Sequence, residues 1–247
     1  MDDQTAKALK YLRLGGLHAH WDEYLTLAQE QRFSHARLLE YVLEQECKIK
    51  SEHARKLRLR RARIPEPFVI ETYPFDRQPK LDKKKVLSLY DAFEYIAKSQ
   101  NIIWVGPTGC GKTGLATGFL IEAINRGYTG CFVEFPELIR DLFKSVADHS
   151  EQKVLKRYVS YDCLVIDEVG YVEVEPAQVG LFFTLMHMRH KKKPTLITSN
   201  LGFSEWRSFL KNDHLTAALI DRLTENSHVI NMKNCGSIRP KLSPPES

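Results

Sequence analysis

A glycine-rich string, Gly106-Pro-Thr-Gly-Cys-Gly-Lys-Thr113, has the residue types and spacing needed to hold a polyphosphate. It fits the pattern G-x-x-x-x-G-K-[ST], whose glycines let successive backbone amides converge on one anion. An apolar run precedes the string and a helical pattern follows it, so the phosphates would lie at a helix N-terminus. We predict that the whole string lines the site: Gly106, Pro107, Thr108, Gly109, Cys110, Gly111, Lys112 and Thr113.

Two carboxylates follow the apolar strand predicted for Cys163 to Ile166. Ligands of open α/β sheets bind outside the carboxyl ends of the strands. We therefore predict that Asp167 holds Mg²⁺ together with the Thr113 hydroxyl. Glu168 is predicted to deprotonate the water that attacks the γ-phosphate, while Lys112 contacts the β- and γ-phosphates. The alternative is a strand end that carries two solvated acids.

Two more polar residues are candidates for the same reaction. Asn200 follows the strand predicted for Thr195 to Thr198 and would contact the attacking water or the γ-phosphate, although a turn asparagine is the alternative. Arg222 lies in a helical pattern from Leu215 to Asn226 and would reach a neighbouring subunit as an arginine finger. Its alternative is a salt-bridged surface arginine. The sequence contains no Asn-Lys-x-Asp string, so ATP is favoured over GTP.

Short apolar strands alternate with helical segments from residue 83 onward. This alternation is typical of a parallel sheet with helices on both faces, an α/β fold. We predict helices from Gly114 to Arg126 and from Pro176 to His190. The predicted strands are Asn101 to Val105, Gly130 to Phe135, Cys163 to Ile166, Thr195 to Thr198 and Ser227 to Ile230.

The chain before residue 83 has a different composition. Residues 1–64 are predicted to form a small helical domain of three helices, in which Gly15-Gly16 ends the first helix and Ser34 caps a long one. Residues 65–82 hold four prolines and are predicted to be an extended linker whose aromatic side chains pack on a domain. Residues 83–247 would then form the ATPase domain.

A dense basic run ends the helical domain. Residues 48–63 hold eight lysines and arginines, opposed only by Glu52. Such a helix can neutralise DNA phosphates without reading bases. The alternative is a helix that docks on an acidic protein partner. The residues predicted to bind DNA are Arg55, Lys56, Arg58, Arg60, Arg61 and Arg63.

Composition narrows the class of protein. The chain has 247 residues and a formal net charge of +5. No apolar stretch is long enough to cross a bilayer, and no secretory signal is evident. Five scattered cysteines without a Cys-x-x-Cys pair favour a reduced, cytoplasmic protein. We also expect Cys110 to be the most reactive cysteine, because loop amides and Lys112 would stabilise its thiolate.

Several strings together resemble the IstB-like ATP-binding proteins, helper ATPases of bacterial insertion sequences within the AAA+ superfamily and close to the DnaC-like helicase loaders. The resemblance spans nearly the whole chain. Gly114 and Ile238 depart from it, standing where histidine and tyrosine are usual. The strings include Tyr73-Pro74-Phe75-Asp76, Gly106 to Thr113, Ile166 to Tyr171, Ile197 to Leu201, Phe203-Ser204-Glu205-Trp206 and Ala217 to Leu223.

The resemblance implies a role for each site residue and a topology. Lys112 and Thr113 match Walker A, Asp167 and Glu168 match Walker B, Asn200 matches sensor 1, and Arg222 matches the arginine finger. It further implies a five-stranded sheet of order 5-1-4-3-2 and a reduced or absent C-terminal lid.

The function implied is an ATP- and Mg²⁺-dependent helper that forms ATP-bridged rings or helical assemblies on duplex DNA. It would recruit or stimulate a transposase. Two alternatives remain open: a replicative helicase loader that acts on a ring helicase and single-stranded DNA, and a DNA-binding adaptor with negligible hydrolysis.

Overall fold

The computed structural model describes residues 1–172 and 174–239, and it divides the chain into two compact units. The first unit is Met1–Leu57, and the second begins at Arg58. The dividing point lies inside a helix, so residues 58–64, which the sequence grouped with the helical domain, belong to the second unit. No helix of the described residues is long and apolar enough to span a membrane.

The first unit is entirely helical. Its long helix α4 begins after Ser34, whose hydroxyl accepts the backbone N–H of Arg37 at 3.2 Å, as expected of a cap. The prediction of three helices is wrong, because the glycine pair forms a short helix of its own. There Gly16 packs so closely on α4 that a Cβ would lie 2.4 Å from Ile49 Cδ1. The helices are α1 (Asp3–Tyr11), α2 (Gly15–Ala19), α3 (Trp21–Glu30) and α4 (His35–Arg61).

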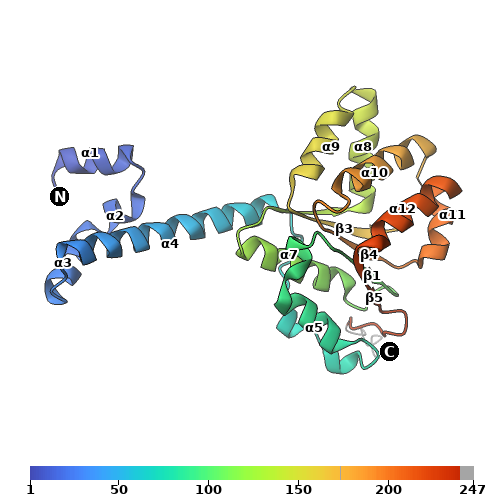
Figure 1. The fold of residues 1–247 in the computed structure, drawn as a ribbon, viewed down its shortest axis with the longest axis horizontal. Helices are drawn as coiled ribbons and strands as arrows, with labels where there is room; N and C mark the ends of the chain where they lie inside the picture. The colour runs from blue at the N-terminus through green and yellow to red at the C-terminus, as the bar shows by residue number, and fades with distance from the viewer. Residues whose placement is uncertain (173, 240–247) are drawn as a thin grey trace, which may run out of the picture. The chain divides into compact units, whose positions relative to one another are not determined.

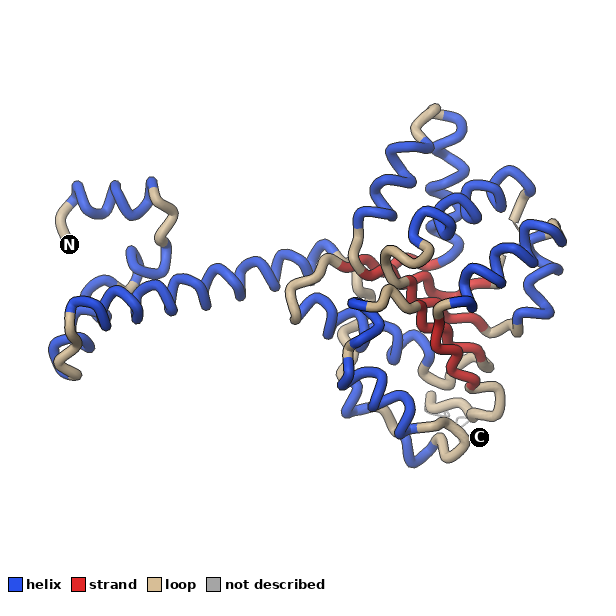
Figure 2. Tube along the Cα trace, viewed as in Figure 1, coloured by secondary structure: helices blue, strands red, loops and turns tan. Residues whose placement is uncertain are grey.

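The second unit is built on one parallel sheet of order β2-β3-β4-β1-β5, which confirms the predicted order read from its other edge. Figures 1 and 2 show helices on both faces of this sheet. All five predicted strands are present, with ends that differ by up to three residues. The strands are β1 (Asn101–Val105), β2 (Gly130–Glu134), β3 (Cys163–Val169), β4 (Thr195–Ser199) and β5 (Ser227–Asn231).

Alternate side chains of each strand supply two separate cores. On one face, Ile102 and Trp104 pack with helices α5 to α7, and on the other, Ile103 and Val105 pack with helices α8 to α12. The helices of this unit are α5 (Lys83–Ala92), α6 (Glu94–Ala97), α7 (Lys112–Asn125), α8 (Phe135–Ala147), α9 (Glu151–Ser160), α10 (Pro176–Arg189), α11 (Trp206–Leu210) and α12 (Asp213–Glu225).

The proline-rich segment of residues 65–82 packs on the first of these faces. Two 3₁₀ turns, η1 (Ile70–Thr72) and η2 (Phe75–Arg77), place Ile70, Tyr73 and Phe75 in the core that α7 also joins. A third turn, η3 (Phe203–Glu205), precedes α11. Among the described residues after β5, 232–239, there is no helix.

Candidate nucleotide site

The predicted phosphate loop joins the carboxyl end of β1 to the first turn of α7. Gly109 and Gly111 have φ of +83° and +90°, a left-handed backbone that glycine adopts without strain. Lys112 is 9% exposed, and its ammonium donates hydrogen bonds to the Gly106 oxygen at 2.8 Å and the Pro107 oxygen at 2.9 Å. Burial lowers the pKa of Lys112. A buried ammonium that contacts two neutral carbonyls is suited to an anionic ligand.

Two threonine hydroxyls donate hydrogen bonds to the Asp167 carboxylate near the end of β3. The Thr113 hydroxyl donates to it at 3.0 Å, and the Thr198 hydroxyl of β4 donates from the other side. Burial raises the pKa of Asp167, while the hydrogen bonds from Thr198 and Thr113 oppose that rise. Carboxylate and hydroxyl oxygens are the ligands that Mg²⁺ takes in phosphoryl-transfer sites. The structure brings Thr113 and Asp167 together, and their joint binding of Mg²⁺ stays a prediction.

Glu168 has an unusual backbone conformation. Its φ is +59°, in the left-handed region that non-glycine residues rarely adopt. The pairing of β3 with β4 shifts register between Ile166 and Val169, which makes a bulge at this point. The Glu168 N–H donates to the Thr198 hydroxyl at 3.0 Å, and the Ser199 hydroxyl donates to the Val169 oxygen at 2.6 Å. Two hydroxyls of β4 therefore hold the bulge that carries Glu168.

The nucleotide cleft, a hollow of about 220 Å³, lies between the phosphate loop and the ends of β3 and β4. Asn200 lines it, and its side-chain oxygen is buried without a hydrogen-bond partner among the described residues. Tyr171 closes one side, with its hydroxyl 2.9 Å from that of Thr108. Burial and the nearby Asp167 raise the pKa of Glu168, which also lines the cleft. A base with a raised pKa beside an orphaned acceptor suits the activation of a water molecule.

The strap, residues 232–239, lies against the phosphate loop. The Ile238 N–H donates to the Gly109 oxygen at 2.9 Å, and a Cβ on Gly109 would lie 2.6 Å from Ser237 Oγ. Gln78 binds the strap through two hydrogen bonds. Its side-chain N–H donates to the Gly236 oxygen at 2.6 Å, and its side-chain oxygen accepts the Gly236 N–H at 3.1 Å. The strap brings Ile238 and Arg239 to the lining of the nucleotide cleft.

The residue at position 114 has a packing explanation. The ring of Phe68 lies where a side chain would be, since a Cβ on Gly114 would lie 2.8 Å from Phe68 Cε2. Phe68 itself lines the cleft. The glycine thus admits an aromatic ring from the proline-rich segment to the start of α7.

Arg222 lies away from the cleft of its own chain. Its guanidinium carbon lies 4.4 Å from the centre of the Phe183 ring, and one of its nitrogens donates to the Ala218 oxygen at 3.4 Å. The residues that line the nucleotide cleft do not include Arg222.

Residues of the basic run have unequal surroundings. Arg55 donates two hydrogen bonds to Glu52, at 2.7 and 2.8 Å, and lowers the pKa of that carboxyl to about 2. Lys56 lies 3.7 Å from the same carboxylate. Arg63 pairs with Glu137 of α8 at 3.1 Å.

The expectation for Cys110 is wrong. Its side chain is fully buried, and burial raises the pKa of its thiol more than the nearby Lys112 lowers it. Its carbonyl accepts the Tyr73 hydroxyl at 2.7 Å. The thiol lies in the core that Tyr73 joins, and this burial outweighs the backbone amides of Cys110 and Lys112, which act to lower its pKa.

Sequence reasoning gave no role in the site to Thr198, Phe68, Tyr171, Ile238 or Arg239. Thr198 contacts both carboxylate-bearing residues, while Phe68 and Tyr171 form walls of the cleft. The polar pair Thr198-Ser199, which directly follows the apolar Leu196-Ile197, was a usable signal for Thr198. No local pattern signals Phe68, because its role depends on the path of a segment that has no regular structure.

The family model of the IstB-like ATP binding proteins matches residues 7–243. The putative ATP-binding protein of insertion sequence IS21 from Pseudomonas aeruginosa is 30% identical over 225 residues, which cover 91% of this chain and 84% of that protein. The putative ATP-binding protein of insertion sequence IS5376 from Geobacillus stearothermophilus is 29% identical over 222 residues, which cover 90% of this chain and 88% of that protein.

Solved structures share the fold. The DnaC helicase loader aligns with a TM-score of 0.54 and 21% identity, covering 70% of this chain and 97% of that one. AMPPCP-bound DnaA from Aquifex aeolicus aligns with a TM-score of 0.57 and 17% identity, covering 69% and 51%.

Proposed function

Because the chain belongs to the family of IstB-like ATP-binding proteins, we propose that it is an ATPase that assists the transposition of an insertion sequence. The observation that carries the proposal is the convergence of Lys112, Thr113, Asp167 and Glu168 on one cleft at the carboxyl ends of the strands. This arrangement supports hydrolysis in addition to binding, since Glu168 stands at the cleft as a base.

Each residue has a distinct part in the proposed reaction. The loop amides and Lys112 bind the β- and γ-phosphates. Thr113 and Asp167 hold Mg²⁺, which would neutralise charge on the phosphates. Glu168 accepts the proton of the attacking water, and the free side-chain oxygen of Asn200 orients that water.

Arg222 completes the site from a second subunit in this proposal. Arg222 does not line the cleft of its own chain, which supports that role, because a residue outside its own cleft can reach a phosphoryl group only in another subunit. ATP would thereby bridge subunits, and turnover would depend on assembly.

Duplex DNA and a transposase are the proposed partners, in the bacterial cytoplasm. The relatives named above are ATP-binding proteins of insertion sequences, and the arginines at the end of α4 supply positive charge for phosphate contacts. The predicted DNA-binding set remains Arg55, Lys56, Arg58, Arg60, Arg61 and Arg63.

Two substitutions test the ATPase. Lys112→Ala should abolish ATP binding, measured by calorimetry, because it removes the cation that contacts the phosphates. Glu168→Gln should bind ATP normally and release no phosphate. A wild-type rate of phosphate release from Glu168→Gln would show that Glu168 is not the base.

The helicase-loader alternative makes a different prediction about DNA. A transposition helper should retain duplex DNA in an ATP-dependent pull-down, whereas a loader should retain single-stranded DNA. The matches to DnaC and DnaA are below 25% identity, so they establish the fold and do not favour the loader.

A further inference from the structure

A second hollow lies at the amino ends of the strands, whereas the nucleotide cleft lies at their carboxyl ends. This arginine cleft has a volume of about 480 Å³ and is found at the amino ends of β2 and β3. Among the described residues, no aliphatic or carboxylate side chain lines it. Its residues are Arg58, Arg60, Arg61, Arg63, Thr129, Gly130, Ser160 and Tyr161.

The arginine-bearing wall is attached firmly to the sheet. The carbonyl of Ala62, directly after α4, accepts the N–H of Phe132 in β2 at 2.7 Å. Ala62 is fully buried, and Arg63 is paired with Glu137. The last turn of α4 is therefore held in one place beside β2, and its guanidiniums are presented from a fixed backbone.

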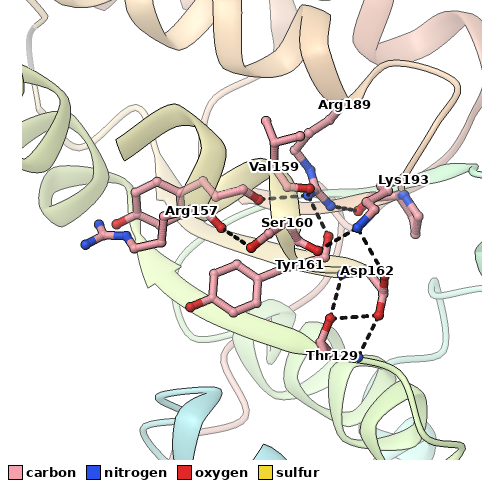
Figure 3. Close-up of polar contacts among 10 residues, drawn as sticks. Thr129, Arg157, Val159, Ser160, Tyr161, Asp162, Arg189 and Lys193 are labelled. Carbon is pink, nitrogen blue, oxygen red and sulfur yellow. Dashed lines mark hydrogen bonds and ion pairs between the residues drawn. The ribbon is translucent and has the colours of Figure 1, made fainter. Parts of the chain in front are cut away.

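The opposite wall has its acceptors already occupied by cations (Figure 3). Arg189 is 1% exposed and donates to the carbonyl oxygens of Tyr158 at 2.9 Å and Tyr161 at 2.8 Å. Lys193 donates to the Ser160 oxygen at 2.5 Å. The carbonyls at the end of α9 and directly after it are thus directed at the protein's own positive groups, and the wall offers little negative charge to the arginines.

The Asp162 carboxylate, which follows Tyr161 of this wall, also has partners of its own. Asp162 accepts the Thr129 N–H at 2.9 Å and the Thr129 hydroxyl at 2.7 Å, and it pairs with Lys193 at 3.1 Å. Asp162 does not line the arginine cleft. Among the described residues, the ion pair of Asp162 is with Lys193 and not with an arginine of α4.

Three guanidiniums of the cleft therefore lack a counterion within the described part of the chain. Arg58 has its Nε buried without a hydrogen-bond partner there. Arg60 and Arg61 are exposed, and the ion pairs of the described residues include neither. Three guanidiniums without a counterion around one hollow are suited to an anionic ligand.

We propose that the arginine cleft binds backbone phosphates of duplex DNA through Arg58, Arg60 and Arg61. This inference rests on the proposed function, and it narrows the predicted DNA-binding set to one site. Guanidinium groups donate two parallel hydrogen bonds to phosphate oxygens, which suits a cleft rich in N–H donors. Arg55 and Lys56 are left out of the site because neither lines the arginine cleft, and both contact Glu52.

The test measures binding of a fluorescent duplex of mixed sequence to the full chain with a non-hydrolysable ATP analogue, over a series of salt concentrations. The variant is Arg58→Gln/Arg60→Gln/Arg61→Gln. Its matched control, Lys144→Gln/Lys153→Gln/Lys156→Gln, removes three exposed charges from α8 and α9 of the same unit. Calorimetry of ATP binding checks that each variant is folded.

The cleft variant should bind DNA at least ~10-fold more weakly at low salt, with a salt slope reduced by about 0.9 for each phosphate that it no longer neutralises. The control should bind within about twofold of the wild type. Arg58→Lys should also weaken binding, because it keeps the charge but removes the paired guanidinium donors that match phosphate oxygens.

The possible results separate the two claims. If the wild type binds duplex DNA and the cleft variant matches the lysine control, the arginine cleft is not the site, and the proposed function stands. If Arg58→Lys binds like the wild type, the binding is diffuse and the cleft makes no built site. If the wild type itself fails to bind duplex DNA, both the DNA contact of the proposed function and this inference are wrong.

Discussion

At the scale of single residues, Thr198 joins the two carboxylates of the nucleotide site. Its hydroxyl donates to Asp167 and accepts the N–H of Glu168. Thr198→Val should lower kcat and leave ATP affinity nearly unchanged, because it removes a hydrogen bond to a carboxylate and leaves the Glu168 N–H without its acceptor. The lost hydrogen bond to a charged group is worth about 1.5–3 kcal/mol, and a transition state destabilised by that amount lowers kcat by roughly 10–100-fold.

Thr198→Ser is the control for this prediction, since it keeps the hydroxyl and should restore most of kcat. Steady-state kinetics of both variants decide the matter. Equal rates for the valine and serine variants would mean that the hydroxyl does not position Glu168.

The cysteines make a second prediction at this scale. Cys47 of α4 is exposed, whereas Cys110, Cys131, Cys163 and Cys235 are buried. We expect Cys47 to react with a small maleimide well before Cys110, because a buried thiol has a raised pKa and no access to the reagent. Mass spectrometry after a short exposure measures the order. Early labelling of Cys110 would contradict the packing of the phosphate loop.

At the scale of elements, helix α12 carries Arg222, whose guanidinium lies over the ring of Phe183. Arg222→Ala should leave ATP binding intact and lower the ATPase rate about 10³-fold, the effect expected of an arginine finger. Mixing this variant with Glu168→Gln should restore part of the rate, since some interfaces would then pair an intact Arg222 with an intact Glu168. Phosphate release from the mixture is the measurement, and a mixture no faster than its parts would contradict action between subunits.

Elements with strong local patterns were predictable from the sequence. The apolar strands and the phosphate loop each carry a signal within a few residues, so the sheet and the positions of Lys112 and Asp167 were expected correctly. The left-handed Glu168 was not expected, because its conformation depends on hydroxyls of β4 that lie about 30 residues further along the chain. Cys110 was mispredicted because charge near a thiol is visible in sequence and burial is not.

At the scale of the whole second unit, the phosphate loop is held between two segments far apart in the sequence. The proline-rich segment supplies Tyr73 and Gln78, and the strap supplies Ile238. Gln78→Ala should lower the unfolding free energy by about 1–3 kcal/mol, because the Gly236 amide and carbonyl lose their partner. It should also weaken ATP binding, since the strap then no longer fixes the loop.

Thermal unfolding with and without ATP measures both effects of Gln78→Ala. The exposed Gln152 of α9 provides a matched control, Gln152→Ala, which should change neither. A Gln78→Ala protein with wild-type ATP affinity would show that the strap is not needed to form the site.

The contact between Ala62 and β2 has a consequence for solubility. β2 is an outer strand, and outer strands with unpaired amides invite backbone pairing with other chains. The Ala62 carbonyl accepts the outward N–H of Phe132, so this N–H is not available for pairing with another chain. A protease cut after Arg63 separates Ala62 from the chain that carries β2, so the remaining fragment should aggregate through β2, which light scattering after limited digestion would detect.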